Sequence, residues 1–338
     1  MGLLRAALIG CGAIAEYHAP ALKAAGFTIT AVASRPGSRT VAAFSLRHGI
    51  PNVFPSPQEL LAARGLWDAL LIAVPPQATL PILKEAVALG VPTLVEKPAA
   101  CTAAELKPLL KREAPVIVGY NRRFYASVQA LQSLVNERSG PFIGQLVISE
   151  PALQGAGDDP ARAFAERLVF NSVHALDLLR FLLGELRIES ARAVAREGSF
   201  GVVAILRAED SGSLVNLTAV AGAPVNVSLN LFQPDLALHL QPFETLRVYR
   251  SMQRIEPDEK TPWRRYVPEL AGQVELDPPD AAYKPGFYRQ ALAFKRLVCG
   301  EKPQGAATLT DAYRALRLAE GLIAALEGAT LNRSGETQ

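Results

Sequence analysis

Hydrophobic and polar positions are arranged differently in the first 120 residues and in the rest of the chain, and this change predicts two domains. In the first 120 residues, short apolar runs such as Ala69–Val74 and Thr93–Val95 alternate with stretches whose apolar positions recur at helical spacing. Such runs are typical of parallel strands buried on both faces, with helices between them. The pattern predicts an N-terminal α/β domain, a Rossmann doubly wound parallel sheet over residues 1–121.

The predicted elements of this domain follow directly from that alternation. The predicted strands are Ala6–Ile9, Thr28–Ala33, Ala69–Val74, Thr93–Val95 and Val116–Val118. The predicted helices are Ala13–Ala25, Ser38–His48, Pro57–Ala63, Thr79–Leu89 and Ala103–Lys111.

The period changes after residue 121. Between Glu189 and Tyr249 the chain alternates at every second position, most clearly over Val225–Leu231, which favours an antiparallel sheet. Helices are predicted at Tyr125–Arg138, His174–Leu183, Pro285–Leu297 and Leu309–Leu326. Residues 122–338 are therefore predicted to form an α+β domain with a large, mainly antiparallel open sheet. We expect this domain to bind the substrate. Its alternating strands would present a broad sheet face that needs a partner if half of it is apolar, which predicts a homodimer or homotetramer.

Composition and charge exclude several classes of function. The 338 residues are 49% hydrophobic and 20% charged, with a net charge of +3 and no Lys/Arg run, so nucleic-acid binding is not expected. The three cysteines form neither a CxxC pair nor a metal-ligand spacing with the four histidines, so no metal site is expected. Without a signal pattern or a membrane-length apolar stretch, the sequence predicts a cytoplasmic protein with free thiols and no membrane partner.

A glycine turn follows the first strand and opens the first helix. In Gly10-Cys11-Gly12-Ala13-Ile14-Ala15, Gly10 allows the tight turn, Gly12 lets the backbone approach a pyrophosphate, and Ala15 packs the helix close to the strand. The diphosphate would then lie on the helix N-terminus. Gly10, Cys11, Gly12, Ala13 and Ile14 are the candidate cofactor residues here, joined by Val74, Pro75 and Pro76 after the third strand.

The end of the second strand bears on the choice of cofactor. An acidic residue would normally hold the ribose hydroxyls there, but this chain has Ser34 and Arg35, with Arg39 one turn later. A hydroxyl and two guanidiniums suit a 2′-phosphate, so NADP is preferred over NAD. The alternative is that Arg35 and Arg39 are simply solvated surface residues.

Lys97 is the strongest candidate for a catalytic role. It lies in Glu96-Lys97-Pro98, directly after a predicted apolar strand. Open α/β sheets bind ligands outside the carboxyl ends of their strands. Its ammonium could stabilise the charge that develops on a substrate oxygen as hydride moves. Glu96 could be the partner of the lysine or could face the nicotinamide; the residues leave both open.

His174 is the second candidate. It begins a predicted helix, and Asp177 lies three residues later on the same face, where it could hold the imidazole tautomer. The alternative is a helix-start histidine bonded to backbone. His18 and His48, in helices of the first domain, are predicted to be structural.

Three residues after the last Rossmann strand complete the candidate substrate site. Tyr120, Asn121 and Arg123 could line the cleft, and Arg123 could hold an anionic substrate group or form a structural ion pair. Asn171 and Asp177 are further substrate candidates in the second domain.

At these motifs the chain resembles the Gfo/Idh/MocA family, named for glucose-fructose oxidoreductase and inositol dehydrogenase. The resemblance rests on the glycine turn, Ile72–Pro76, Glu96-Lys97-Pro98, the segment Val118–Phe124 and the segment Val173–Arg180. It implies an NAD(P)-dependent dehydrogenase or reductase acting on CH–OH groups of a sugar, polyol or related carbonyl compound. In such an enzyme Lys97 would polarise the reacting oxygen, His174 would assist proton transfer, and the open sheet would form the oligomer interface.

One position departs from the family pattern. The family commonly has an aspartate four residues before the histidine, where this chain has Phe170. Two functions therefore stay open: an NADP-preferring oxidoreductase, or a non-catalytic dinucleotide-binding sensor or scaffold.

Overall fold

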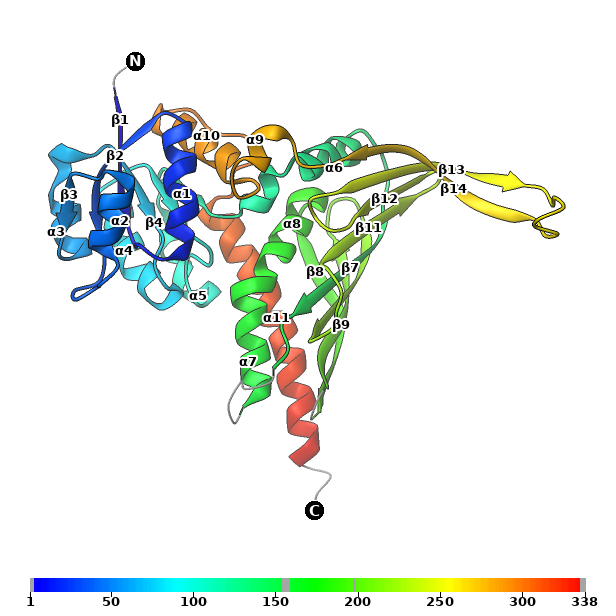
Figure 1. Cartoon of the computed structure of the whole chain (residues 1–338). Coiled ribbons are helices and arrows are strands. Elements are labelled where there is room, and N and C mark those ends of the chain that lie inside the picture. The colour runs from blue at the N-terminus through cyan, green and yellow to red at the C-terminus, as the bar shows by residue number, and fades with distance from the viewer. Residues whose placement is uncertain (1–2, 154–158, 197–198, 335–338) are drawn as a thin grey trace. The chain divides into compact units, whose positions relative to one another are not determined.

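The computed structural model describes residues 3–153, 159–196 and 199–334 (Figure 1). The chain forms two compact units. Unit 1 comprises Met1–Phe124 and Asp277–Arg317, and unit 2 comprises Tyr125–Leu276 and Leu318–Gln338. The chain thus returns to unit 1 at Asp277 and enters unit 2 again at Leu318, so its last helix contributes to both units.

Unit 1 contains a six-stranded sheet in the order β3-β2-β1-β4-β5-β6, and every pairing is parallel. This confirms the doubly wound prediction, since the order reverses beside β1. Its strands are β1 (Leu4–Ile9), β2 (Phe27–Ala33), β3 (Asn52–Phe54), β4 (Ala69–Ile72), β5 (Thr93–Val95) and β6 (Val116–Val118).

Helical segments connect each pair of successive strands in this sheet. They are α1 (Ala13–Ala24), α2 (Val41–His48), α3 (Pro57–Ala62), η1 (Arg64–Leu66), α4 (Pro76–Ala88), α5 (Ala103–Leu106) and η2 (Leu109–Lys111). Three further segments belong to unit 1, namely η3 (Asn121–Phe124), α9 (Pro278–Ala281) and α10 (Phe287–Val298). Helix α10 packs on the first βα unit, where Phe294 stacks on Phe27 with ring centroids 5.4 Å apart.

Unit 2 is built on an eight-stranded sheet in the order β14-β13-β12-β11-β7-β10-β9-β8. Its strands are β7 (Ile143–Glu150), β8 (Leu186–Arg196), β9 (Ser199–Ala208), β10 (Leu214–Ala221), β11 (Ser228–Gln233), β12 (Leu236–Leu240), β13 (Leu246–Ile255) and β14 (Arg265–Val274). All pairs are antiparallel except β7 with β10. The predicted fold class of both parts is confirmed.

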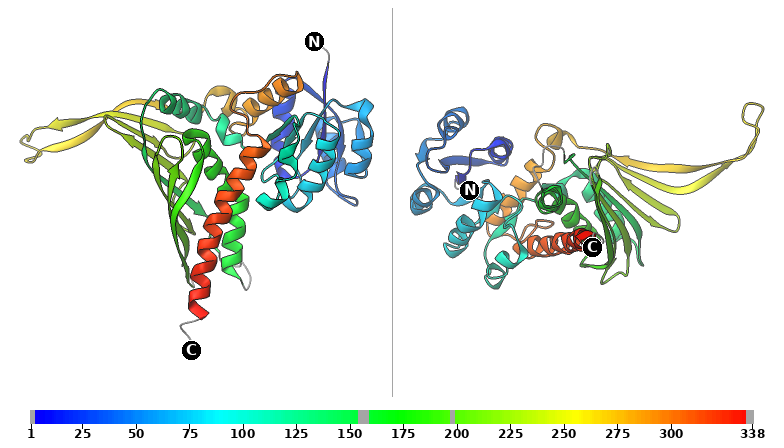
Figure 2. Two further views of the ribbon diagram at one scale, coloured as in Figure 1. Left: turned by 180° about the vertical axis from the view of Figure 1, so that it is seen from behind. Right: turned by 90° about the horizontal axis from the view of Figure 1, so that it is seen from below.

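Helices cover one face of this sheet. They are α6 (Ala126–Asn136), α7 (Pro160–Arg167), the π-helical η4 (Leu168–Ser172), α8 (Val173–Leu183) and the later part of α11 (Leu309–Ser334). Figure 2 shows α8 and α11 side by side along the sheet. Along β7, every second residue from Gly144 to Glu150 is buried, which marks the face that the helices cover.

Some predicted boundaries were wrong for identifiable reasons. The strand predicted at Val225–Leu231 begins only at Ser228, because the amide of Val225 donates to Ala223 O in a local turn (2.8 Å). Strand β14 was not predicted, since Pro268 interrupts its pattern; an edge strand tolerates that proline. Among the described helices none is long and apolar enough to span a bilayer.

Candidate functional site

Five strands of unit 1 end in register. Ile9 aligns with Ala33 and Ile72, and Val95 aligns with Ile72 and Val118. The residues that follow these positions, which we call the carboxyl edge, are Gly10, Ser34, Ala73, Glu96 and Gly119. Parallel pairing thus brings the glycine turn and the Lys97 segment, far apart in sequence, to one border of the sheet, where doubly wound folds bind ligands.

The glycine turn has the geometry that its sequence predicts. Gly10 has φ +107°, and a Cβ there would lie 2.1 Å from Ala73 O, so this position excludes every other residue. Gly12 is the N-cap of α1, and no side chain of the described residues caps this helix. A Cβ at Gly12 would meet no described atom within 4 Å. The turn therefore leaves open space directly at a helix N-terminus, as a diphosphate requires.

Cys11 contributes backbone rather than thiol chemistry to this turn. Its side chain is buried, and its Sγ lies 3.9 Å from Ala33 O. Burial raises the pKa of the Cys11 thiol to about 11, with a smaller contribution from the Glu16 carboxylate. The thiol is therefore protonated and inert at neutral pH.

The segment after β2 is exposed and bonded only locally among the described contacts. Arg35 and Arg39 are exposed, and Ser34 is half-buried. The amide of Ser38 donates to Arg35 O (3.1 Å), and the hydroxyls of Ser38 and Thr40 lie 3.1 Å apart. No acidic residue occurs between residues 34 and 40. This segment presents two cations and several hydroxyls with no carboxylate of its own.

The segment after β5 is enclosed. Lys97 is half-buried, and the Lys97–Pro98 peptide bond is cis. The Glu96 carboxylate is buried: its Oε2 accepts a bond from the Lys97 amide (3.1 Å), and its Oε1 lies 2.7 Å from His18 Nε2. Of the two partners considered for Glu96, the structure shows a bond to the backbone of the lysine, together with a histidine that the sequence did not suggest.

The residues after β6 are tied into unit 1. Tyr120 is buried, and Asn121 donates from Nδ2 to Pro285 O (2.9 Å) in the loop before α10. Arg123 is buried and forms an ion pair with Asp311 (3.3 Å). The guanidinium of Arg123 therefore already has a carboxylate partner within the chain.

The candidates of unit 2 lie where the π-helical η4 meets α8. Single π-helical turns often occur at functional sites. Phe170 and Asn171 belong to η4, half-buried His174 lies in the first turn of α8, and Asp177 is buried one turn later.

A buried carboxylate that the sequence reasoning missed holds this segment. Glu150, at the end of β7, accepts bonds from Asn171 Nδ2 (3.0 Å) and Ser172 Oγ (2.5 Å). Glu150 and His18 share a signal that sequence reasoning could have used. Each is a polar residue on an apolar stripe, following Leu146 and Ile148 on β7, and Ala15 on α1, respectively.

The structure therefore brings the predicted residues together in two groups. Unit 1 holds all the cofactor candidates and, in addition, Lys97, Tyr120, Asn121 and Arg123. Unit 2 holds Asn171, His174 and Asp177. Among the described residues, no group of three or more His, Cys, Asp or Glu side chains is placed to hold a metal ion.

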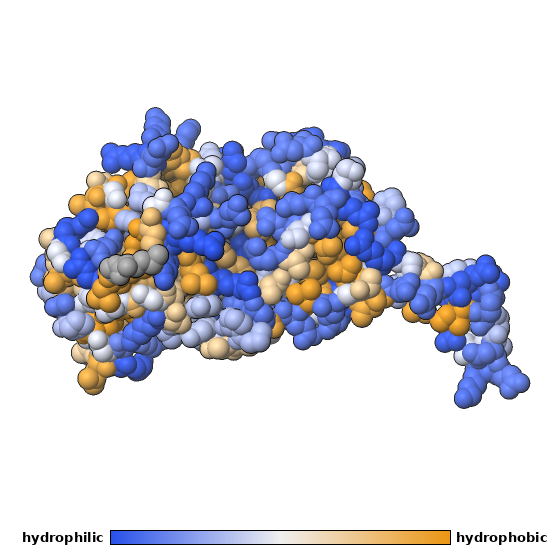
Figure 3. Space-filling view, turned by 90° about the horizontal axis from the view of Figure 1, so that it is seen from above, coloured by the Kyte–Doolittle hydropathy of each residue, from blue (hydrophilic) through white to orange (hydrophobic). Residues whose placement is uncertain are grey.

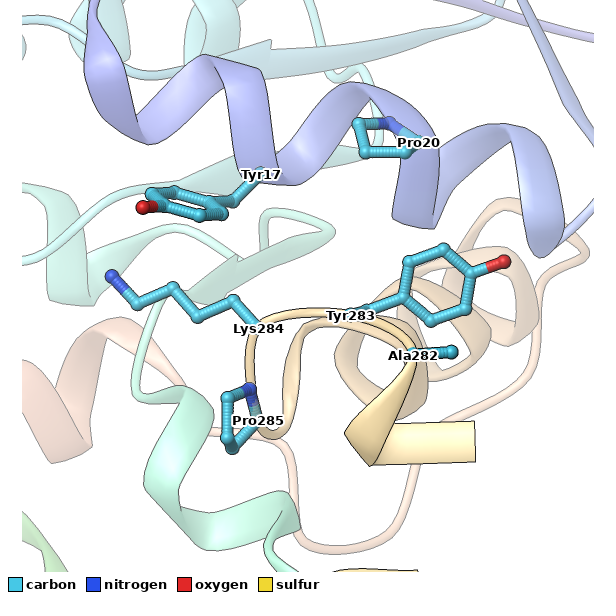
Figure 4. A pocket seen from close by; sticks show the side chains of 6 residues that line it. All are labelled: Tyr17, Pro20, Ala282, Tyr283, Lys284 and Pro285. Atoms are coloured by element: carbon cyan, nitrogen blue, oxygen red, sulfur yellow. The ribbon is translucent and has the colours of Figure 1, made fainter. Parts of the chain in front are cut away.

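A groove of about 530 Å³ lies between α1 and the loop before α10, lined by Tyr17, Pro20, Ala282, Tyr283, Lys284 and Pro285. In Figure 4 the Lys284 side chain runs beside the Tyr17 ring, and its Nζ lies 4.7 Å from the ring centroid. None of its lining residues is a predicted site residue. The groove adjoins the helix that carries His18.

Comparison with known proteins identifies the family. Residues 4–120 match the Gfo/Idh/MocA model, described as an oxidoreductase family with an NAD-binding Rossmann fold. The chain is also 30% identical over 241 residues to inositol 2-dehydrogenase 1 of Saccharopolyspora erythraea. The aligned segment covers 67% of each of the two chains. The chain belongs to the Gfo/Idh/MocA family.

Two further proteins resemble this chain at lower identity or lower coverage. A D-apiose dehydrogenase of Rhizobium rhizogenes is 28% identical over 200 residues, and the match spans only 56% of either chain. A crystal structure of a dehydrogenase from Chromobacterium violaceum has the same fold over 100% of both chains, with a TM-score of 0.76 and 18% identity. The resemblance inferred from Glu96-Lys97-Pro98 and the glycine turn is thus confirmed at the level of family and fold.

Proposed function

We propose that this protein is an NADP-preferring oxidoreductase that transfers hydride between the nicotinamide and a hydroxyl or carbonyl carbon of a sugar, polyol or related small molecule. The observation that carries the proposal is the register of the carboxyl edge, which sets the open glycine turn and the Lys97 segment along one border. The names of the related inositol and D-apiose dehydrogenases support the substrate class.

The residues of unit 1 fit a dinucleotide. Open space at Gly12 and the uncapped start of α1, both judged on the described residues, would accept the diphosphate. Ser34, Arg35 and Arg39 would hold a 2′-phosphate by charge-assisted hydrogen bonds. The bound nicotinamide supplies the hydride donor or acceptor.

Lys97 and His174 divide the remaining chemistry. The ammonium of Lys97 would hydrogen-bond the reacting oxygen and stabilise the negative charge that grows on it. The imidazole of His174 would take or give the hydroxyl proton at neutral pH.

A second function has a specific observation in its favour. Phe170 occupies the place of the usual aspartate and offers no group that exchanges a proton, which favours a dinucleotide-binding sensor or scaffold. The two functions differ in one outcome: a scaffold binds NADPH but oxidises or reduces no compound in a panel of sugars, polyols and small ketones.

The test is a screen of that panel with the wild-type protein, followed by Lys97→Ala. We expect turnover to fall at least about a hundredfold while NADPH affinity changes little, because the ammonium acts on developing charge. Lys84→Ala, at an exposed position of α4, is the matched control and should be indistinguishable from wild type. Equal turnover of Lys97→Ala and wild type would contradict the assignment.

We also propose that the open face of the unit 2 sheet joins copies of this chain. Ile143 and Phe232 are exposed (58% and 38%) and lie opposite each other on neighbouring strands. His239 packs edge-on against Phe232 with ring centroids 5.7 Å apart, so an aromatic pair lies beside Ile143. Light scattering at micromolar concentration should give a dimeric or tetrameric mass, and a monomeric mass would contradict this proposal.

A further inference from the structure

His18 and Glu96, the residue before Lys97, form a buried histidine–carboxylate pair. The His18 side chain is 1% exposed and that of Glu96 is 10% exposed, with Nε2 and Oε1 2.7 Å apart. His18 lies on α1, whose N-terminus is the proposed diphosphate site, and Glu96 is the first residue after β5. The pair therefore links the helix that would bind the cofactor to the segment that carries the lysine.

The second carboxylate oxygen binds the backbone amide of Lys97. The Lys97 amide lies 3.1 Å from Glu96 Oε2, and since a backbone N–H can only donate, Oε2 is the acceptor. The Glu96 amide in turn donates to Ile72 O (2.8 Å), so the backbone on either side of the glutamate α-carbon is held.

The surroundings leave the carboxylate little freedom. A Cβ at Gly119 would lie 3.0 Å from both Cδ and Oε1 of Glu96, so the glycine provides the space that this side chain fills. The His18 ring packs against Phe287 of α10 with centroids 4.5 Å apart. Backbone encloses one partner of the pair and an aromatic ring supports the other.

Burial makes the hydrogen bond from His18 necessary. A buried carboxylate that loses a donor bears a large desolvation cost, which it relieves by protonation or by movement. Either response would change the acceptor of the Lys97 amide. Removing the His18 donor should therefore loosen the backbone at Lys97 before it affects more distant parts of unit 1.

We propose that His18 is a positioning residue, whose Nε2–H orients the Glu96 carboxylate so that this carboxylate holds Lys97 in place relative to α1. The inference rests on the proposed role of Lys97 in hydride transfer. It goes beyond the expectation that His18 is structural.

The chain offers a matched control on the same helix. Glu16 of α1 lies 2.8 Å from His48 Nε2, so it forms a second histidine–glutamate pair of similar length. This pair is more exposed, with 12% and 33% for the two side chains, and Glu16 also binds Arg47. Among the described contacts this pair joins α1 to α2 and reaches neither Lys97 nor His174, so its loss should leave Lys97 unchanged.

The experiment compares His18→Leu, His18→Gln and His48→Leu by amide hydrogen exchange measured by NMR without substrate. We expect exchange at the Lys97 amide to accelerate at least about tenfold in His18→Leu, with the amides of β1 unchanged, because one local hydrogen bond is weakened. His18→Gln, whose amide can still donate to Oε1, should restore most of the protection, and His48→Leu should match wild type. If His18→Leu does not fold, His18→Asn, whose amide is too short to reach, takes its place.

Turnover gives a second readout. In His18→Leu we expect kcat to fall about tenfold or more, with NADPH binding within about threefold of wild type, since a misplaced lysine affects the reacting oxygen more than the diphosphate. Unchanged exchange at Lys97 would overturn the proposal, as would equal loosening across unit 1. The exchange readout needs no turnover, so it separates this inference from a failure of the proposed enzyme activity.

Discussion

The carboxyl edge of unit 1 contains two segments built in opposite ways. After β5, Glu96 is buried and bonded to His18 and to the Lys97 amide. After β2, Arg35 and Arg39 are exposed, and the described backbone contacts of their segment are local. The contrast separates two tasks. The placement of Lys97, the proposed catalytic residue, depends on core packing. The proposed choice of cofactor depends on exposed side chains, which can change without cost to the stability of the fold.

The largest expected effect comes from Gly10, the tightly packed residue that follows β1 at the same edge. Gly10→Ala would place a Cβ 2.1 Å from Ala73 O at a positive φ, so we expect destabilisation of more than about 3 kcal/mol. Thermal unfolding should show a fall in Tm of about 10 °C or no folded protein.

Gly12→Ala is the matched substitution, because its Cβ meets no described atom within 4 Å. It should cost at most about 1 kcal/mol through the N-cap preference, yet weaken NADPH binding at least about tenfold by crowding the diphosphate. Unchanged NADPH affinity in Gly12→Ala would argue that no dinucleotide lies on this turn.

A smaller effect is expected in the exposed segment after β2. Replacing Arg35 and Arg39 together by alanine should raise the KM for NADPH about tenfold, leave that for NADH within about twofold, and leave Tm unchanged. Ser34→Asp should shift the preference further toward NADH, because a carboxylate accepts the ribose hydroxyls and repels a 2′-phosphate. A wild-type preference for NADH would refute the proposed selectivity.

The smallest effect concerns the different reactivity of a buried thiol, Cys11, and an exposed thiol, Cys299. Because the pKa of Cys11 is raised to about 11, only about one thiol in a thousand is ionised at pH 8. Alkylation followed by mass spectrometry should therefore modify exposed Cys299 first and Cys11 last, with the Cys11 rate rising as the pH approaches 11. Equal rates at pH 8 would show that the turn is more open than its packing indicates.

The sequence was most informative where local pattern and packing agree. The apolar strands and the glycine turn predicted the parallel sheet, because buried parallel strands need continuous apolar runs and Gly10 has no substitute at its φ. Glu96-Lys97-Pro98 after β5 likewise identified the family.

Partners that are distant in sequence could not be predicted in the same way. The pairs His18–Glu96 and Glu150–Ser172 join residues from separate elements, and their hydrogen bonds depend on packing that no local pattern encodes. The return of α10 to unit 1 was missed for the same reason, since only the packing of Phe294 on Phe27 reveals it.

The central claim is that the carboxyl edge holds a nicotinamide dinucleotide, and calorimetric titration of the wild-type protein with NADPH tests it most directly. Saturable binding at one site per chain, with a Kd in the range of about 1 to 100 μM, is the predicted result. Absence of binding by both NADPH and NADH up to about 1 mM would contradict the account.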